Sequence, residues 1–278
     1  MAIITLSRQL GCSGSQVAED IAEQLGYQTV GKKEITDMIV KYTDQYSQEL
    51  KSQKKLERAE EEVQAGLFER LRHDHSSYVN LLTSLIYDIA GQDKTIIKGH
   101  GAQIVLSKQP HVFHVRLTGS FDFRVSRIEN QRQLNREAAE QLVKKDDRDR
   151  MGLKRYLFHR DLTGPKWYDV VIDIEKIGVR DVVNMIVIAT RSLEKGFPTT
   201  QTWLESMRAR GLTNLVRAVV KKAMPDMTEV EVIASTNGIV TLYGNVAREK
   251  EKKSLEQRVR SLPKVQDVVN NIKVVTPL

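Results

Sequence analysis

The sequence is poor in cysteine and contains no long apolar run. Cys12 is the one cysteine among 278 residues, so no disulfide can form within the chain and a reducing compartment is expected. No apolar stretch approaches the roughly 20 residues that a membrane-spanning helix needs. The first residues enter a β-like segment without the basic region of a secretory signal. These absences argue against disulfide-stapled and membrane-spanning classes, and we expect a cytoplasmic protein.

The bulk composition is that of an ordinary globular protein. Hydrophobic residues make up 40% and charged residues 28% of the chain, which is not the balance of a disordered chain. Lys and Arg number 43 against 36 Asp and Glu, a net charge of +7. A mildly basic balance suits polyphosphate ligands, nucleic acid or anionic lipid, and does not choose among them.

The first two thirds of the chain alternates strand-like with helix-like segments. The expected strands are residues 2–6, 95–97, 112–117 and 170–173. Helical patterns lie between them, among them a strongly amphipathic one over residues 78–90. Residues 49–72 are highly charged with few apolar positions, which favours solvated helices. Strands separated by helices of this length predict an α/β fold, a three-layer parallel sheet.

The composition and the secondary-structure pattern of the sequence change near residue 196. Residues 196–208 begin with the composition of a linker, and a helical pattern follows. Asn237-Gly238 then lies between two alternating runs. This pair is a strong hairpin signal because both central residues of the turn need a positive φ. A second helix and a last strand complete an α-β-β-α-β pattern, so residues 209–278 predict a small α+β domain.

The stretch "SRQLGCSGSQVAEDIAEQLG", residues 7–26, joins the first strand to a helix through a loop rich in Gly and Ser. In the phosphate-loop pattern G-x-x-x-x-G-K-[ST], backbone N–H groups and a lysine neutralise phosphate charge. In that register Arg8 takes the first glycine position, Gly14 the lysine position and Ser15 the position of the hydroxyl that helps hold Mg²⁺. Arg8 could supply the missing charge from the other side of the loop. The alternative is a tight strand-to-helix turn that needs glycine for geometry alone.

A second basic segment reads "REAAEQLVKKDDRDRMGLKRYLFHRD". On a helix, Lys145 and Asp149 share one face and Arg148 points to an adjacent one. Arginine binds phosphate bidentately, so an Arg-rich helix that closes over a nucleotide can stabilise a transferring phosphoryl group. The alternative is a solvated helix with ion pairs such as Asp146 with Arg150, each contributing about 0.3–0.5 kcal/mol.

Five blocks in order resemble the cytidylate kinase-like family: "ITLSRQLGCSGSQVAEDIAEQLG", "TIIKGHGAQIVL", "VFHVRLTGSFDFRVSRI", "REAAEQLVKKDDRDR" and "WYDVVIDIEKIGVRDVVNMI". The resemblance covers residues 1–195. It implies a P-loop kinase fold that moves the γ-phosphoryl group of ATP to a nucleoside monophosphate with Mg²⁺. It also implies a helical substrate-side insertion over residues 33–90 and lid-like Arg-rich helices over residues 124–162.

The resemblance further implies the site residues. The ATP phosphates would be held by Arg8, Gly11, Cys12, Ser13, Gly14 and Ser15. Ser15 would also hold the metal. The acceptor, resembling cytidine monophosphate, would contact His100, Lys145 and Asp149, and the catalytic group would be Arg148, Asp149 and Arg150. Two positions depart from the family's pattern, because His100 and Gly152 stand where arginines are usual. Near the amino terminus of a predicted helix, Cys12 could also have a lowered pKa.

Residues 209–278 resemble a BON domain through the stretch "VEVIASTNGIVTLYGNVAREKEKKSLEQRVRSLPKVQDVVNNIKVV". This resemblance implies binding to phospholipid surfaces or other macromolecules. Contact with a membrane would take place at the inner face of the cytoplasmic membrane, where anionic headgroups attract basic segments. Self-association or regulation by this domain is an equally good interpretation.

Three functions follow from these patterns. The first is a nucleoside monophosphate kinase-like phosphotransferase that uses ATP and Mg²⁺. The second is a catalytically weak or inactive nucleotide sensor, whose BON domain passes the nucleotide state to a phospholipid surface or a protein partner. The third is a scaffold with a purely structural kinase-like part. No nucleic-acid partner is expected, and homo-oligomerisation is left open.

Overall fold

The computed structural model describes residues 2–46, 75–107, 109–158, 164–224 and 230–275. The chain divides into two compact units. Unit 1 consists of Met1–Glu34 and Gln92–Thr200, and unit 2 of Ile35–Gly91 and Gln201–Leu278. Each unit is described by itself.

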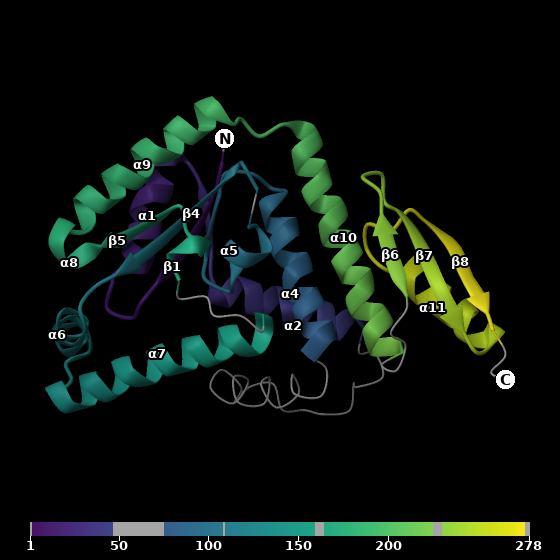
Figure 1. Ribbon diagram of the computed structural model, residues 1–278, viewed down its shortest axis with the longest axis horizontal. Helices are drawn as coiled ribbons and strands as arrows, with labels where there is room; N and C mark the ends of the chain where they lie inside the picture. The colour runs from purple at the N-terminus through teal and green to yellow at the C-terminus, as the bar shows by residue number, and fades with distance from the viewer. Residues whose placement is uncertain (1, 47–74, 108, 159–163, 225–229, 276–278) are drawn as a thin grey trace. The chain divides into compact units, whose positions relative to one another are not determined.

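Unit 1 is built on a five-stranded parallel sheet (Figure 1). The strands are β1 (Ile3–Arg8), β2 (Gln28–Val30), β3 (Thr95–Lys98), β4 (Val112–Thr118) and β5 (Val170–Asp173). Their order across the sheet is β2-β3-β1-β4-β5, so the chain crosses over between neighbouring strands. This confirms the predicted parallel α/β sheet. Strand β2, three residues long, was not expected from the sequence, because so short a run carries no measurable alternation.

Helices surround this sheet. Those of unit 1 are α1 (Gly14–Leu25), α5 (Ala102–Val105), α6 (Phe121–Arg132), α7 (Arg136–Phe158), α8 (Ile174–Ile177) and α9 (Val179–Gly196), with a 3-10 turn η2 at Pro165–Trp167. Helices α1 and α9 pack against each other and cover one face of the sheet. The core on that face includes Ile4 and Leu6 of β1, Val17 and Ile21 of α1 and Ile186 of α9. Ile4 and Leu6, two residues apart on β1, point to this face, as the period-2 geometry of a strand requires.

On the opposite face of β1, Thr5 and Ser7 are polar and buried, next to the buried Ile3. Thr5 Oγ1 lies 2.7 Å from His114 Nδ1, and the backbone N–H of His114 donates to the Asp169 carboxylate at 2.7 Å. The Tyr168 hydroxyl donates to Ser7 Oγ at 3.3 Å. Burial lowers the pKa of His114. These polar side chains are paired with one another, as buried polar groups require, whereas His114 Nε2 has no hydrogen-bond partner among the described residues.

Helices α6 and α7 form a smaller pair with its own core. Val125 and Ile128 of α6 pack against Ala139 and Val143 of α7. Because Ala139 and Val143 are four residues apart, they fix which face of α7 turns inward. That orientation decides which charged residues further along α7 approach the loop after β1.

Unit 2 contains a three-stranded sheet in the order β6-β7-β8. Its elements are α2 (Lys32–Tyr46, from Ile35), α4 (His75–Ala90), α10 (Gln201–Ala223), β6 (Glu231–Ala234), β7 (Ile239–Val246), α11 (Glu249–Arg260) and β8 (Asp267–Val274). Strands β6 and β7 are antiparallel and β7 and β8 parallel. The predicted α-β-β-α-β pattern and the hairpin are confirmed, but the expected turn type is wrong: of Asn237 and Gly238 only Gly238 has a positive φ, of 82°. The turn is longer than two residues, because the Gly238 N–H donates to the Ser235 carbonyl and the Ser235 N–H to the Ile239 carbonyl.

Helix α10 begins earlier than the sequence predicts. It runs from Gln201, so residues 197–200 alone separate it from α9, whereas residues 196–208 were expected to form a linker. Met207, Gly211 and Leu215 are buried at a spacing of four residues. This helical stripe packs along α4 and carries the helix through the predicted linker.

Helices α4 and α10 approach closely at a glycine. A Cβ on Gly211 would lie 2.6 Å from Asp88 Oδ1, so any side chain there would collide with α4. Arg208 donates twice to the Gly91 carbonyl, at 3.1 and 2.9 Å, and satisfies a carbonyl at the end of α4. The Asp88 carboxylate accepts a hydrogen bond from Lys264 at 2.7 Å.

The predicted substrate-side insertion, residues 33–90, therefore contributes to the packing of unit 2. Its helix α4 packs on α10, and Leu81 contacts the core of the β6-β7-β8 domain. Residues 47–74 of the insertion lie outside the described residues. Among the described residues no helix is both long and apolar enough to cross a membrane.

Candidate active site

The loop after β1 is shaped by left-handed backbone. Gly11 has a φ of 90°, and Ser13, the residue before α1, has a φ of 49°. A Cβ on Gly11 would lie 2.8 Å from the Arg124 carbonyl oxygen and 2.9 Å from its Cα. Gly11 is thus required both by its conformation and by the close approach of α6. The loop ends at the amino terminus of α1, where backbone N–H groups favour an anion.

Arg8 runs across this loop rather than away from it. A Cβ on Gly14 would lie 2.5 Å from Arg8 Cγ, and a Cβ on Gly99 would lie 2.8 Å from Arg8 Nη1. The stem of Arg8 therefore passes over Gly14, and its guanidinium group reaches the turn after β3. Burial, and then the neighbouring Arg150, lower the pKa of Arg8 to about 10, while Asp146 raises it. Arg8 remains charged at neutral pH.

The turn after β3 carries three successive left-handed residues. Gly99, His100 and Gly101 have φ values of 86°, 56° and 71°. Burial lowers the pKa of His100 to about 4, with further lowering from the charges of Arg8, Lys32 and Arg150. The imidazole is therefore neutral at physiological pH. It accepts or donates single hydrogen bonds but supplies no charge to a phosphate.

Three cations that lie far apart in the sequence, Arg8, Lys32 and Arg150, all lower the pKa of His100. We name these three cations, together with the neutral His100, the cation cluster. They come from the end of β1, the start of α2, the turn after β3 and helix α7. Asp146 of α7 is the acid that acts on Arg8. Three permanent cations near one carboxylate leave a net positive field, which suits a phosphate-bearing ligand.

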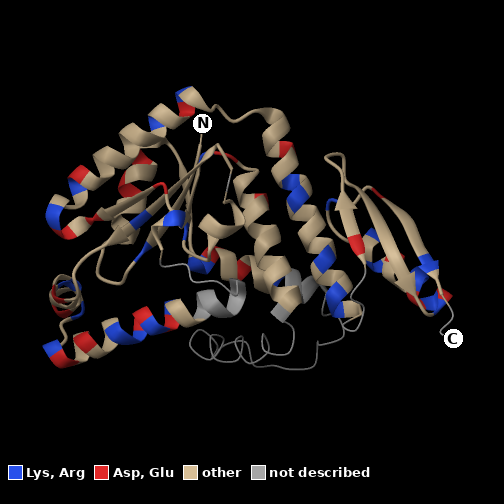
Figure 2. Ribbon diagram, viewed as in Figure 1, with Lys and Arg blue, Asp and Glu red and all other residues tan. Residues whose placement is uncertain are grey.

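Helix α7 carries closely spaced acidic and basic residues (Figure 2), and their burial divides them into two sets. Asp146 pairs with Arg150, as one of the two sequence interpretations expected, and Asp147 accepts two hydrogen bonds from Arg124, at 3.1 and 2.9 Å. These residues continue the inward face begun by Ala139 and Val143. Their side chains join α7 to α6 and to the cation cluster.

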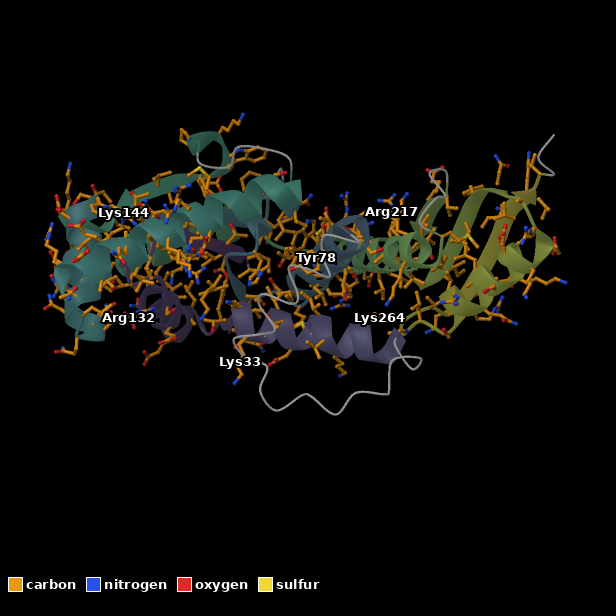
Figure 3. The ribbon with its side chains drawn as sticks, turned by 90° about the horizontal axis from the view of Figure 1, so that it is seen from below. Lys33, Tyr78, Arg132, Lys144, Arg217 and Lys264 are labelled. Carbon is orange, nitrogen blue, oxygen red and sulfur yellow. The ribbon has the colours of Figure 1, made fainter. Side chains whose placement is uncertain are left out.

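The second set faces solvent. Lys145, Arg148 and Asp149 are all exposed, as is Lys144 one residue earlier (Figure 3). The structure therefore brings Arg150 and His100 of the expected site residues together with Arg8, and leaves Lys145, Arg148 and Asp149 outside that group. A Cβ on Gly152 would meet no atom within 4 Å, so this position is open too.

Two arginines of α6 belong to the site and were missed from the sequence. Arg127 donates to Ser13 Oγ at 2.6 Å and lies over the Phe123 ring. Arg124 is buried, and besides Asp147 it donates to the Gly119 carbonyl at 3.3 Å. The signal was available: two arginines three apart at the start of a helix that follows a parallel strand lie on one face, at the strand's carboxyl end.

The remaining loop residues have distinct environments. Cys12 is 1% exposed, and burial raises the pKa of its thiol to about 11, so the lowered pKa expected at a helix terminus is wrong. Burial outweighs the nearby charge of Arg124, which acts in the opposite direction. Ser15 lies exposed in the first turn of α1.

No group of three His, Cys, Asp or Glu side chains that could hold a metal ion occurs within the described ranges. Mg²⁺ in kinase sites is bound by one or two protein ligands together with substrate phosphates. The exposed Ser15 hydroxyl beside the loop fits that mode, in which the phosphates supply most of the ligands.

One of the solved structures that this chain is similar to shares its fold. An uncharacterized protein from Eubacterium ventriosum is 19% identical, with a TM-score of 0.52 over 69% of this chain and 98% of that one. A shikimate kinase from Acinetobacter baumannii (16% identity, TM-score 0.37, 69% and 94% coverage) and a gluconokinase from Sinorhizobium meliloti (14%, 0.38, 70% and 94%) are more distant. No match was found among curated proteins.

Family models divide the chain as the sequence does. Residues 212–276 match the BON domain, which corresponds to the end of α10 and the β6-β7-β8 sheet. Residues 3–176 match the cytidylate kinase-like family and span the sheet of unit 1, the loop after β1, the turn after β3 and helices α6 and α7. With well over half of its length covered by that match, the chain belongs to the cytidylate kinase-like family and carries a BON domain at its carboxyl end.

Proposed function

We propose that this protein transfers the γ-phosphoryl group of ATP to a nucleoside monophosphate, with cytidine monophosphate or a related compound as acceptor. The observation that carries the proposal is the cation cluster at the carboxyl ends of β1 and β3. Transfer from a triphosphate to a monophosphate brings negatively charged groups together at one point, and positioned cations in a partly dehydrated site stabilise them. The family match supports the same class of reaction.

Each group of residues would have a role that follows from its position in the fold. The loop from Gly11 to Ser15, at the amino terminus of α1, would bind the donor phosphates through backbone N–H groups. Ser15 would provide a protein ligand to Mg²⁺, which supplies charge neutralisation when bound. Arg150 would stabilise the transferring group from α7. Arg148 and Asp149, both exposed, would reach the nucleotides only if α7 moves toward them.

The test is turnover by the purified full chain with ATP, Mg²⁺ and a panel of nucleoside monophosphates, read as conversion to nucleoside diphosphates by chromatography. We expect conversion for a pyrimidine acceptor, and a loss of about 100-fold or more for Arg150→Gln. The exposed Arg132→Gln on α6 is the matched control and should leave turnover within about twofold. No conversion of any acceptor above the enzyme-free rate would refute the proposal.

A catalytically weak nucleotide sensor is the second candidate, and a specific observation favours it. Lys145 and Asp149, expected at the acceptor, are exposed, and His100 is neutral where relatives carry a charged arginine. A protein that binds ATP but lacks these acceptor contacts would signal rather than catalyse. The BON domain would then deliver the nucleotide state to an anionic phospholipid surface or a protein partner.

This candidate is separated from the first by binding measurements. ATP at 100 times its Kd should stabilise the protein by about 2.7 kcal/mol, without conversion of any acceptor. Flotation of the full chain with vesicles of anionic or neutral phospholipid should then show salt-sensitive binding to the anionic ones. Absence of thermal protection by ATP would exclude the sensor, and equal binding to both vesicles would exclude the lipid surface.

A further inference from the structure

Positions 8 and 14 are sterically coupled. A Cβ on Gly14 would lie 2.5 Å from Arg8 Cγ, 3.0 Å from its Cβ and 3.1 Å from its Cδ. These atoms belong to the stem of Arg8, close to the backbone of β1, and cannot swing aside as the tip of a flexible chain can. A residue with a side chain at position 14 therefore displaces Arg8. The two positions together admit one long side chain.

This coupling matches a reciprocal exchange in the sequence. The standard phosphate loop has glycine at the position of Arg8 and lysine at the position of Gly14. Here the cation stands at the first position and glycine at the second. One exchange without the other would leave either a clash or a loop with no cation. The missing lysine is thus one half of a paired change.

We propose that Arg8 replaces the phosphate-loop lysine and, because its guanidinium group reaches the Gly99-His100-Gly101 turn, contacts the transferring phosphoryl group from between donor and acceptor. Nη1 of Arg8 lies beside Gly99, since a Cβ built on Gly99 would be 2.8 Å from that nitrogen. Arg8 also acts electrostatically on His100. This catalytic role rests on the proposed phosphoryl transfer, whereas the steric exchange and the binding of a polyphosphate do not.

Arginine suits such a bridging position better than lysine. A guanidinium group presents five N–H donors in a planar fork, so it can hold oxygens of two phosphates at once, whereas an ammonium acts as a point charge. The turn after β3 carries neutral His100 where relatives carry arginine, so the guanidinium of Arg8 also supplies charge that the acceptor side lacks. Arg150 and Lys32 contribute from the other sides of the cluster.

The experiment compares four variants of the full chain: Arg8→Gly, Arg8→Gln, Gly14→Lys and the double exchange Arg8→Gly with Gly14→Lys. Thermal unfolding reads the steric coupling. Titration calorimetry with inorganic tripolyphosphate reads the cation, independently of any acceptor. Turnover with the acceptor panel is the third readout. Arg132→Gln, an exposed arginine of α6, serves as the control that changes one positive charge away from the loop.

We expect Gly14→Lys alone to lower the unfolding midpoint and the double exchange to restore it. Arg8→Gln should weaken tripolyphosphate binding by about 10-fold to 100-fold, Arg8→Gly should do the same, and the double exchange should recover most of that loss. Where turnover is measurable, Arg8→Gln should reduce kcat more than it raises KM. The control should change the affinity by less than about threefold.

Three results would overturn the proposal. They are a Gly14→Lys variant as stable as the unchanged protein, an Arg8→Gln variant that binds tripolyphosphate as well as the control does, and an unchanged protein that does not bind tripolyphosphate at all. The proposed function fails separately: if no acceptor is converted while the exchange still restores stability and binding, Arg8 is a polyphosphate-binding residue of a sensor. If turnover is present and Arg8→Gln leaves kcat unchanged, its catalytic part is wrong.

Discussion

Replacing Asp147 with alanine leaves the Arg124 guanidinium without its carboxylate. The Arg124 side chain is 5% exposed and that of Asp147 is 32% exposed. Two hydrogen bonds, of 3.1 and 2.9 Å, join them, and they connect α6 to α7 next to the loop after β1. The change tests whether this ion pair holds the Arg-rich helix in place.

The size of the effect follows from the burial of each partner. Removing one partner of a fully buried ion pair costs about 3–5 kcal/mol, because the other charge stays desolvated. Water can reach the vacated Asp147 position, and Arg124 keeps its bond to the Gly119 carbonyl. We therefore expect a loss of about 2–3 kcal/mol, with a coupling energy of about 1–2 kcal/mol in a double-mutant cycle with Arg124→Met.

The measurement is urea unfolding followed by tryptophan fluorescence. The chain has two tryptophans, so a Trp203→Phe background leaves Trp167 to report on unit 1. Asp122→Ala is the matched control, since Asp122 also pairs with an arginine but its side chain is 79% exposed; it should cost less than about 0.5 kcal/mol. A loss for Asp147→Ala no larger than that of the control would refute the reasoning.

Three further outcomes are expected. Because the pKa of His100 is about 4 when folded and near 6.5 when unfolded, the unfolded state binds more protons between these values. Unit 1 should lose up to roughly 3 kcal/mol as the pH falls through this window, and His100→Asn should remove most of that dependence in urea titrations. The raised pKa of Cys12 predicts slow reaction with Ellman's reagent in the native protein and rapid reaction in urea; equal rates would contradict it. Lys264→Met leaves the Asp88 carboxylate, whose side chain is 12% exposed, without its cation. It should lower the free energy of unfolding of unit 2 by about 1–2 kcal/mol, and an unchanged unfolding curve of Trp203 fluorescence would contradict this.

The sequence predicted the sheet where alternation is long enough to register. The segments at residues 2–6 and 112–117 became β1 and β4, and Asn237-Gly238 became the turn of the β6-β7 hairpin. The helical residues 201–208 were taken for a linker because Pro198 and the polar residues around it dominate their local composition. What makes them helical is packing along α4, a contact between segments more than a hundred residues apart, which no local pattern reports.

The sequence located the loop of the candidate site, but not the direction in which the side chains of α7 point. The loop glycines and Arg8 were found because their positions follow from a motif. Lys145 and Asp149 were placed at the acceptor by the order of charges in the segment, yet they are exposed. The rotation of α7 depends on Ala139 and Val143, whose burial turns Asp146 and Asp147 inward instead. A resemblance transfers positions along a chain, whereas side-chain direction depends on what the helix packs against.

The packing of helix α4 constrains how these two domains can be separated. It lies in the stretch that matches the kinase-like family, yet it contributes Leu81 to the carboxyl-terminal core and approaches α10 where Gly211 leaves room for Asp88. A gene cut between α9 and α10 would expose the face of α4 that meets α10 and remove part of that core's wall. The BON domain of this protein therefore cannot be separated from α4 without loss of packing. A larger residue at position 211 would require the Asp88 side chain to move and would crowd the Ser84 carbonyl oxygen, which lies 3.2 Å from a Cβ placed there.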